Sequence, residues 1–84
     1  MNYSIKIKAS AAKSLGKVAK AERIRIIEAI DRLANEPLAG GVLKGEFSGM
    51  RRLRVGHYRI VYEVSKRELT VLVVRIGHRR DIYR

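Results

Sequence analysis

The apolar residues of this chain change their spacing twice within 84 residues, and this change restricts the fold. Tyr3, Ile5 and Ile7 alternate with polar residues, which is the period-two pattern of a strand that buries one face. From about residue 19 to 34 the apolar residues recur with helical period, and after residue 50 the period of two returns. The sequence therefore predicts one N-terminal strand, a helical segment and several C-terminal strands.

The helical segment divides into two helices. Ser10 is predicted to cap a short helix that runs through Leu15, and a break is expected between Gly16 and Lys20. A longer helix then runs to about Asn35, since Pro37 disfavours helical geometry at the residue before it. Its predicted apolar stripe comprises Ala19, Ile26, Ile27, Ile30, Leu33 and Ala34.

Ile24 lies away from that stripe, at the edge of the polar side of the longer helix. Two interpretations of Ile24 are open: an anchor for a partner protein, or packing on the first helix.

The second half of the chain is predicted to form three strands. The period of two places Leu53 and Val55 opposite Arg52 and Arg54, and a turn follows at Gly56. Tyr58, Ile60, Tyr62 and Val64 then form one apolar face, residues 65–68 connect, and residues 69–76 form a strand that Gly77 ends. We expect an α+β fold of order β-α-α-β-β-β, one domain over residues 1–84, with a helical hairpin on one face of a mostly antiparallel four-stranded sheet.

The net charge of +11 is larger than solubility of a small domain requires, which favours an anionic partner such as a nucleic acid. Residues 43–84 contribute most of it, with 11 basic and 4 acidic side chains. The chain has no cysteine and its two histidines lack a metal-binding pattern, so neither a metal nor another cofactor is expected. No apolar stretch is long enough for a membrane span, so we expect a cytoplasmic protein with no membrane partner.

Strand alternation predicts that Arg52, Arg54, His57 and Arg59 share one side of the sheet. Arginine binds phosphate oxygens through two parallel hydrogen bonds and stays charged, so it stabilises a transition state but takes no proton. If this chain cleaves RNA without a metal, the general base and acid must come from a second group, namely His57, His78 and Tyr83.

Each of these three residues also has a structural interpretation. His57 follows Gly56 and can be an exposed residue of a tight turn. His78 can be an exposed residue of the C-terminal tail, and Tyr83 can be a half-buried aromatic residue at the edge of the core. Tyr58 and Tyr62 are assigned to the core, because they share a face with Ile60.

Three segments carry a resemblance to a known family: Leu43-Lys44-Gly45, the run from Ser48 to Tyr62, and the run from Val74 to Tyr83. The pattern "LKG…G..RLRVG.YRI.Y" followed by "GHRR..Y" resembles the RelE/ParE toxin superfamily, in its RelE-like branch. The resemblance implies an mRNA interferase that acts in the ribosomal A site. It also implies an acidic, RelB-like antitoxin that wraps the toxin in a hetero-oligomer, and a helix break near Val18.

By position, Arg59 matches the family's arginine on the sheet, Arg79 the arginine after the last strand, and Tyr83 the C-terminal tyrosine. Whether Arg79 or Arg80 is the functional match is open. Some relatives have lysines at the positions of Arg52 and Arg54, and arginine cannot shuttle a proton, so more acid–base work falls on Tyr83 and the histidines. The predicted RNA-binding residues are Lys44, Arg51, Arg52, Arg54 and Arg80.

Three functions fit this sequence: a ribosome-dependent endoribonuclease, a ParE-like inhibitor of DNA gyrase on the same fold, and a degenerate toxin without activity. Fold alone does not separate them. The titratable groups in Gly-His-Tyr-Arg and Gly-His-Arg-Arg favour the ribonuclease, because a gyrase inhibitor requires no proton transfer.

Overall fold

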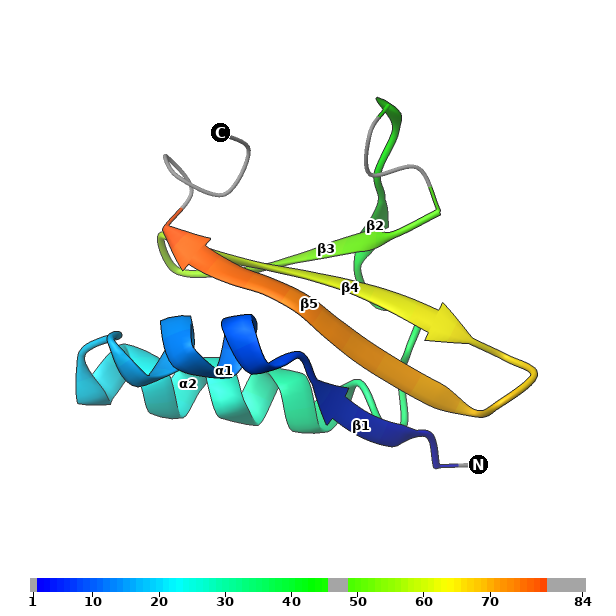
Figure 1. Ribbon diagram of the computed structural model, residues 1–84, viewed down its shortest axis with the longest axis horizontal. Coiled ribbons are helices and arrows are strands. Elements are labelled where there is room, and N and C mark those ends of the chain that lie inside the picture. Colours follow the sequence, from blue (N-terminus) through cyan, green and yellow to red (C-terminus); the bar gives the residue numbers. More distant parts are fainter. Residues whose placement is uncertain (1, 46–48, 79–84) are drawn as a thin grey trace.

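The computed structural model describes residues 2–45 and 49–78 and shows two helices packed against one sheet (Figure 1). The helices are α1 (Ala9–Gly16) and α2 (Lys20–Arg32). The strands are β1 (Ser4–Ile7), β2 (Gly41–Val42), β3 (Arg51–Val55), β4 (Tyr58–Ser65) and β5 (Thr70–His78).

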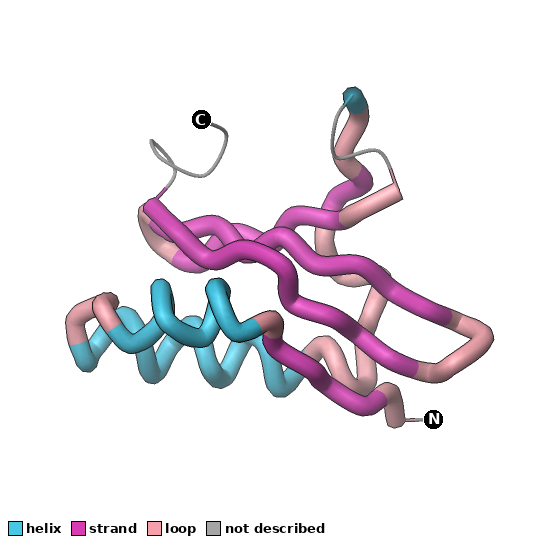
Figure 2. Tube along the Cα trace, viewed as in Figure 1, coloured by secondary structure: helices cyan, strands magenta, loops and turns pink. Residues whose placement is uncertain are grey.

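The strands form one sheet in the order β1-β5-β4-β3-β2. β1 is parallel to β5, and the other neighbours are antiparallel. Both helices lie on the same side of this sheet, and the described residues place no helix on its other face (Figure 2). The predicted α+β fold is confirmed.

The sheet differs from the prediction by one strand. Gly41 and Val42 pair with Arg52 and Arg51, which makes a fifth strand at the edge. A strand of two residues is too short to show a period of two in the sequence. Only its pairing with β3 defines it as a strand. The four strands predicted from the sequence therefore do not include this segment.

The break between the two helices is confirmed, since α1 ends at Gly16 and α2 begins at Lys20. The prediction that Ser10 caps α1 is wrong. The helix begins at Ala9, with Lys8 at the cap position and no side-chain hydrogen bond there, so Ser10 already lies inside the first turn. Its carbonyl accepts a hydrogen bond from the Ser14 hydroxyl at 3.1 Å.

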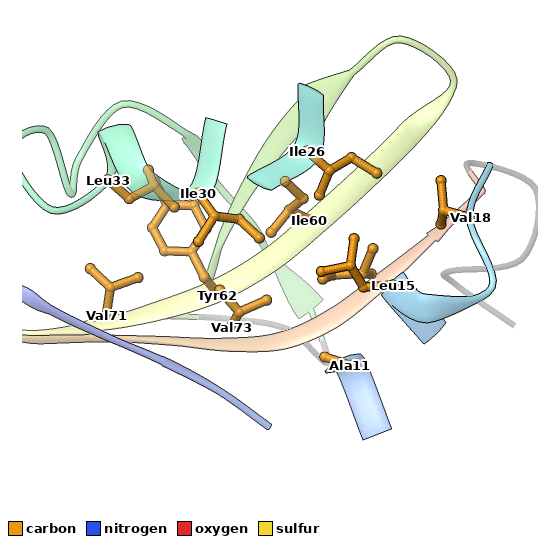
Figure 3. Packing of buried hydrophobic residues seen from close by; sticks show 11 residues of the cluster. Ala11, Leu15, Val18, Ile26, Ile30, Leu33, Ile60, Tyr62, Val71 and Val73 are labelled. Atoms are coloured by element: carbon orange, nitrogen blue, oxygen red, sulfur yellow. The ribbon is translucent and has the colours of Figure 1, made fainter. Parts of the chain in front are cut away.

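The core lies between the helices and the sheet, and Figure 3 shows its packing. From α2 it receives Ile26, Ile30 and Leu33, which follow one line of side chains along the helix. Ile27 was predicted to share this stripe but is 42% exposed. The stripe of α2 side chains that the sheet buries is therefore narrower than the predicted one. The other buried members are Ala11, Leu15, Val18, Ile60, Tyr62, Val71, Val73 and Ile76.

The two predicted core tyrosines are confirmed, and one of them makes polar contacts. Tyr58 is half-buried against the core, whereas Tyr62 is fully buried. The Tyr62 hydroxyl accepts a hydrogen bond from the Gly40 amide and donates one to the Pro37 carbonyl, each at 2.9 Å. Burial raises the pKa of Tyr62, while the hydrogen bond from Gly40 and the charge of Arg51 act in the lowering direction.

β5 extends past its predicted end and contains a bulge. Gly77 does not end the strand, which continues to His78. Val61 pairs with Arg75 while Tyr62 pairs with Val73, so Val74 is the extra residue. The bulge reverses the alternation, and it leaves Ile76 in the core while Arg75 lies on the same face as Val61.

None of the helices that the structure describes is long and apolar enough to cross a membrane.

Candidate functional site

The sheet face turned away from α1 and α2 carries three residues of the predicted site, Arg52, Arg54 and Arg59. We call it the open face and define it by residues that alternate with the core positions: Arg52, Arg54, Arg59, Val61, Glu63, Leu72 and Arg75. Val61 is fully buried without belonging to the core cluster. Its partners across the strands are Arg52 and Arg75, whose aliphatic stems flank it.

Three arginines meet on this face, as the alternation predicted. Arg54 and Arg59 occupy directly opposed positions of β3 and β4, and Arg52 lies two residues from Arg54 on the same strand. Opposed side chains on neighbouring strands lie about 5 Å apart at Cβ, a distance at which two like charges destabilise a sheet. Arg54 is exposed and Arg52 and Arg59 are half-buried, so their guanidinium groups offer an anion a binding site made of several cations.

The two histidines lie together at one end of the sheet, and His78 shares the core-packed side of Tyr58 and Ile76 and not the open face. The rings of His57 and His78 stack with centroids 6.1 Å apart and an angle of 21° between their planes. Tyr58 meets His78 edge-on, with centroids 5.8 Å apart. His78 pairs with Tyr58 and Gly77 pairs with Arg59, so the histidine pair begins one ladder position from Arg59.

Arg51 points to the other side of the sheet from Arg52. Its guanidinium donates hydrogen bonds to the carbonyls of Gly40 at 2.7 Å and Leu38 at 3.3 Å, and in this way it holds the loop before β2. Lys44 is exposed beyond β2. The contacts of Arg51 and Lys44 with RNA stay predictions, and Arg79, Arg80 and Tyr83 lie outside the described residues.

Within residues 2–45 and 49–78, no three His, Asp or Glu side chains gather as they would around a metal ion. The ionisable groups that the strand register places on the described part of the open face are guanidinium groups, the amine of Lys6 and one carboxylate, that of Glu63.

The sequence analysis missed the pairing of the histidines, and it missed Arg75 and Glu63 as members of the open face. Arg75 lies in the mostly apolar strand predicted over residues 69–76. The bulge at Val74 places Arg75 on the open face, and composition alone does not predict a bulge. Glu63 could have been found, because it follows Arg59 and Val61 at even spacing.

A family model described as the ParE toxin of the type II toxin–antitoxin system parDE matches residues 5–83. A curated relative, toxin RelG of Mycobacterium tuberculosis, is 34% identical over 86 residues, which span 100% of this chain and 99% of RelG.

The fold is also similar to that of solved toxin structures. The toxin–antitoxin complex RelBE2 of M. tuberculosis superposes with a TM-score of 0.85 at 29% identity, over 93% of this chain and 99% of that one. The archaeal RelE–RelB complex of Pyrococcus horikoshii gives a TM-score of 0.80 at 30% identity, over 96% of this chain and 99% of the other. The chain belongs to the RelE/ParE superfamily and is a toxin of the type II toxin–antitoxin class.

Proposed function

We propose that this toxin is a metal-independent endoribonuclease that cleaves mRNA in the cytoplasm, in the ribosomal A site. The observation that carries the proposal is the direct opposition of Arg54 and Arg59 on the open face, with Arg52 beside them. A phosphate between these guanidinium groups would accept charge-assisted hydrogen bonds from both of them.

The reaction is an attack of the RNA 2′-hydroxyl on the adjacent phosphorus. The 2′-oxygen loses its proton to a general base and bonds to phosphorus, while the bond to the leaving 5′-oxygen breaks and that oxygen takes a proton from a general acid. The products are a 2′,3′-cyclic phosphate and a 5′-hydroxyl. Negative charge accumulates on the phosphate oxygens, where Arg52, Arg54 and Arg59 stabilise it.

The imidazoles of His57 and His78 are the described groups suited to proton transfer. Histidine is the side chain that most often serves as general acid or base in proteins. The rings stack beside Tyr58, one ladder position from Arg59 and on the helix-facing side of the sheet, so RNA held by the arginines would have to pass around the end of the sheet to reach them. In this proposal Tyr83 is the base and a histidine is the acid, with Arg79 or Arg80 as a further cation.

The partner that restrains the toxin would be an acidic, RelB-like antitoxin. The similar structures from M. tuberculosis and P. horikoshii are complexes of toxin and antitoxin. A net charge of +11 favours an antitoxin of opposite charge, and charge complementarity speeds the association of such partners.

An in vitro translation reaction with the purified chain tests the proposal. Primer extension on the mRNA is expected to reveal new 5′ ends within codons, and these ends should persist in the presence of a metal chelator when cleavage is assayed on preassembled ribosomes. The alternative, which the ParE description of the matching family favours, is inhibition of DNA gyrase. A supercoiling assay with the same preparation separates the two, since an endoribonuclease leaves gyrase active.

A further inference from the structure

A groove of about 460 Å³ lies on the open face, and none of the three clustered arginines lines it. Leu72 and Val74 from β5, together with Met50 before β3, supply its apolar surface. Its polar lining residues are Lys8, Glu63 and Arg75. Mostly apolar surface with a few polar groups is the usual composition of a site for a flat aromatic ligand.

Glu63 stands out because of its charge. The strands that the structure describes contain a single acidic residue, Glu63 of β4, which is exposed. A carboxylate opposes the binding of phosphate at its own position, and an ionised carboxylate accepts hydrogen bonds without donating any. Glu63 can therefore accept hydrogen bonds from a ligand's donor groups, while Lys8 and Arg75, the other polar lining residues, carry positive charge.

The groove and the arginine cluster lie along one line of the sheet. Arg59, Val61 and Glu63 follow one another on the same face of β4, and four residues of strand span about 13 Å. An RNA strand whose phosphate contacts Arg54 and Arg59 would reach the groove with a neighbouring nucleotide. Single-stranded RNA is read by its bases in this way, with each base turned out against the protein surface.

We propose that this groove binds one base of the RNA and that the Glu63 carboxylate selects guanine there. Guanine presents two adjacent donors on its Watson–Crick edge, N1–H and the exocyclic amino group, which match the two oxygens of a carboxylate. Adenine and cytosine present one amino group beside an acceptor nitrogen, and uracil presents one N–H between two carbonyls. Glu63 is thus a specificity-determining residue, and this role rests on the proposed function.

The test measures affinity for four short single-stranded RNAs that differ only in one central base. They carry 2′-O-methyl groups, so that the attacking hydroxyl is blocked and binding is measured without cleavage. The wild-type chain is expected to bind the guanine RNA about tenfold more tightly than the others, the usual range for one bidentate contact. In Glu63→Gln the four affinities converge, because an amide offers one acceptor oxygen instead of two.

Two further variants separate this inference from the proposed function. Arg54→Ala is expected to weaken all four RNAs alike and to keep the guanine preference. Glu28→Gln removes the same charge as Glu63→Gln from the exposed side of α2 and is expected to change nothing. Thermal melts of all variants confirm that each is folded.

A second measurement maps cleavage sites in a translation reaction. Wild-type sites should be enriched in guanine at one position, and Glu63→Gln should lose that enrichment while it still cleaves. Equal wild-type affinity for the four RNAs, together with cleavage sites that show no guanine, overturns the base site and leaves the ribonuclease standing. The base site is also overturned if Glu63→Gln keeps the guanine preference. The same holds if Glu63→Gln changes only the affinity for the antitoxin. If the chain neither binds nor cleaves RNA, the proposed function and this inference both fail.

Discussion

Tyr62 and Gly40 are joined by a hydrogen bond of 2.9 Å, from the amide of the loop to the buried hydroxyl in the middle of β4. The same hydroxyl donates to the Pro37 carbonyl, and Arg51 holds the Gly40 carbonyl from the other direction. These contacts fix the loop after α2 against the sheet and thereby set β2 beside Arg52.

Gly40→Ala is expected to destabilise the fold. A methyl group at this position would lie 2.6 Å from the Arg52 carbonyl oxygen and 2.8 Å from the Tyr62 hydroxyl, so the loop would have to move. The cost should be about 1–3 kcal/mol in the free energy of unfolding, the usual range for overpacking. Gly41→Ala is the matched control, since nothing lies within 4 Å of its added carbon. Urea denaturation measures both, and equal midpoints for the two variants would contradict the role given to Gly40.

The stability of the folded chain is expected to fall at alkaline pH through Tyr62. Its pKa is raised above 10.0 in the fold, so the folded state holds the phenolic proton more tightly than the unfolded state. This contribution is fully present below the unfolded pKa and is lost as pH rises through the folded value. Between about pH 8 and pH 11, the wild type should therefore lose more stability than Tyr62→Phe, which has no phenol to ionise. Parallel losses in urea melts would count against this prediction.

Local signals in the sequence were sufficient for the break between the helices and for the three arginines of the open face. The break after Gly16 and the alternation of Arg52 and Arg54 with apolar residues depend on neighbours in sequence, and both were confirmed. Pairings between distant segments were not accessible in this way. His57 meets His78 because β5 continues past Gly77 to pair with Tyr58, a contact over twenty residues that no local period reports.

Arg54→Ala is expected to weaken RNA binding and to reduce its dependence on salt. Each phosphate contact releases counterions, so the loss of one contact lowers the slope of log affinity against log salt by about one. Arg67→Ala removes an exposed arginine from the turn between β4 and β5 and serves as the control. The RNA affinities of the wild type and both variants are measured at several salt concentrations. A wild-type affinity that does not change with salt would exclude binding through the phosphate backbone.

Ile24→Asp is expected to lower antitoxin affinity without loss of stability. Ile24 is 46% exposed and Ile27, one turn away on α2, is 42% exposed, so the anchor interpretation of Ile24 is the one that fits its exposure. A charge at the centre of an apolar contact costs affinity because it must be desolvated. Leu69→Asp is the control, since Leu69 lies in the distant β4–β5 turn with a φ of 52°, a conformation that aspartate tolerates better than leucine. Unchanged affinity for the antitoxin in Ile24→Asp would remove Ile24 from the interface.

Tyr83→Phe is expected to slow RNA cleavage and to leave the fold intact. A phenol has a reference pKa near 10 and is a poor base at neutral pH unless neighbouring cations stabilise the phenolate. Arg52, Arg54 and Arg59 supply such cations on the open face, and Arg79 and Arg80 precede Tyr83 in the sequence. Removal of the hydroxyl alone should cost about 10²–10⁴ in rate, the usual contribution of general acid–base catalysis.

The competing assignment gives the base to the histidine pair, and matched variants separate the two. Single-turnover cleavage of mRNA on programmed ribosomes is measured for Tyr83→Phe, His57→Ala, His78→Ala and Arg59→Ala, with a thermal melt of each. If Tyr83 is the base and a histidine the acid, Tyr83→Phe and one histidine variant are slow, and Arg59→Ala is at least as slow because it loses charge stabilisation. A Tyr83→Phe variant that cleaves at the wild-type rate while His57→Ala is inactive would transfer the role of base to the histidine pair.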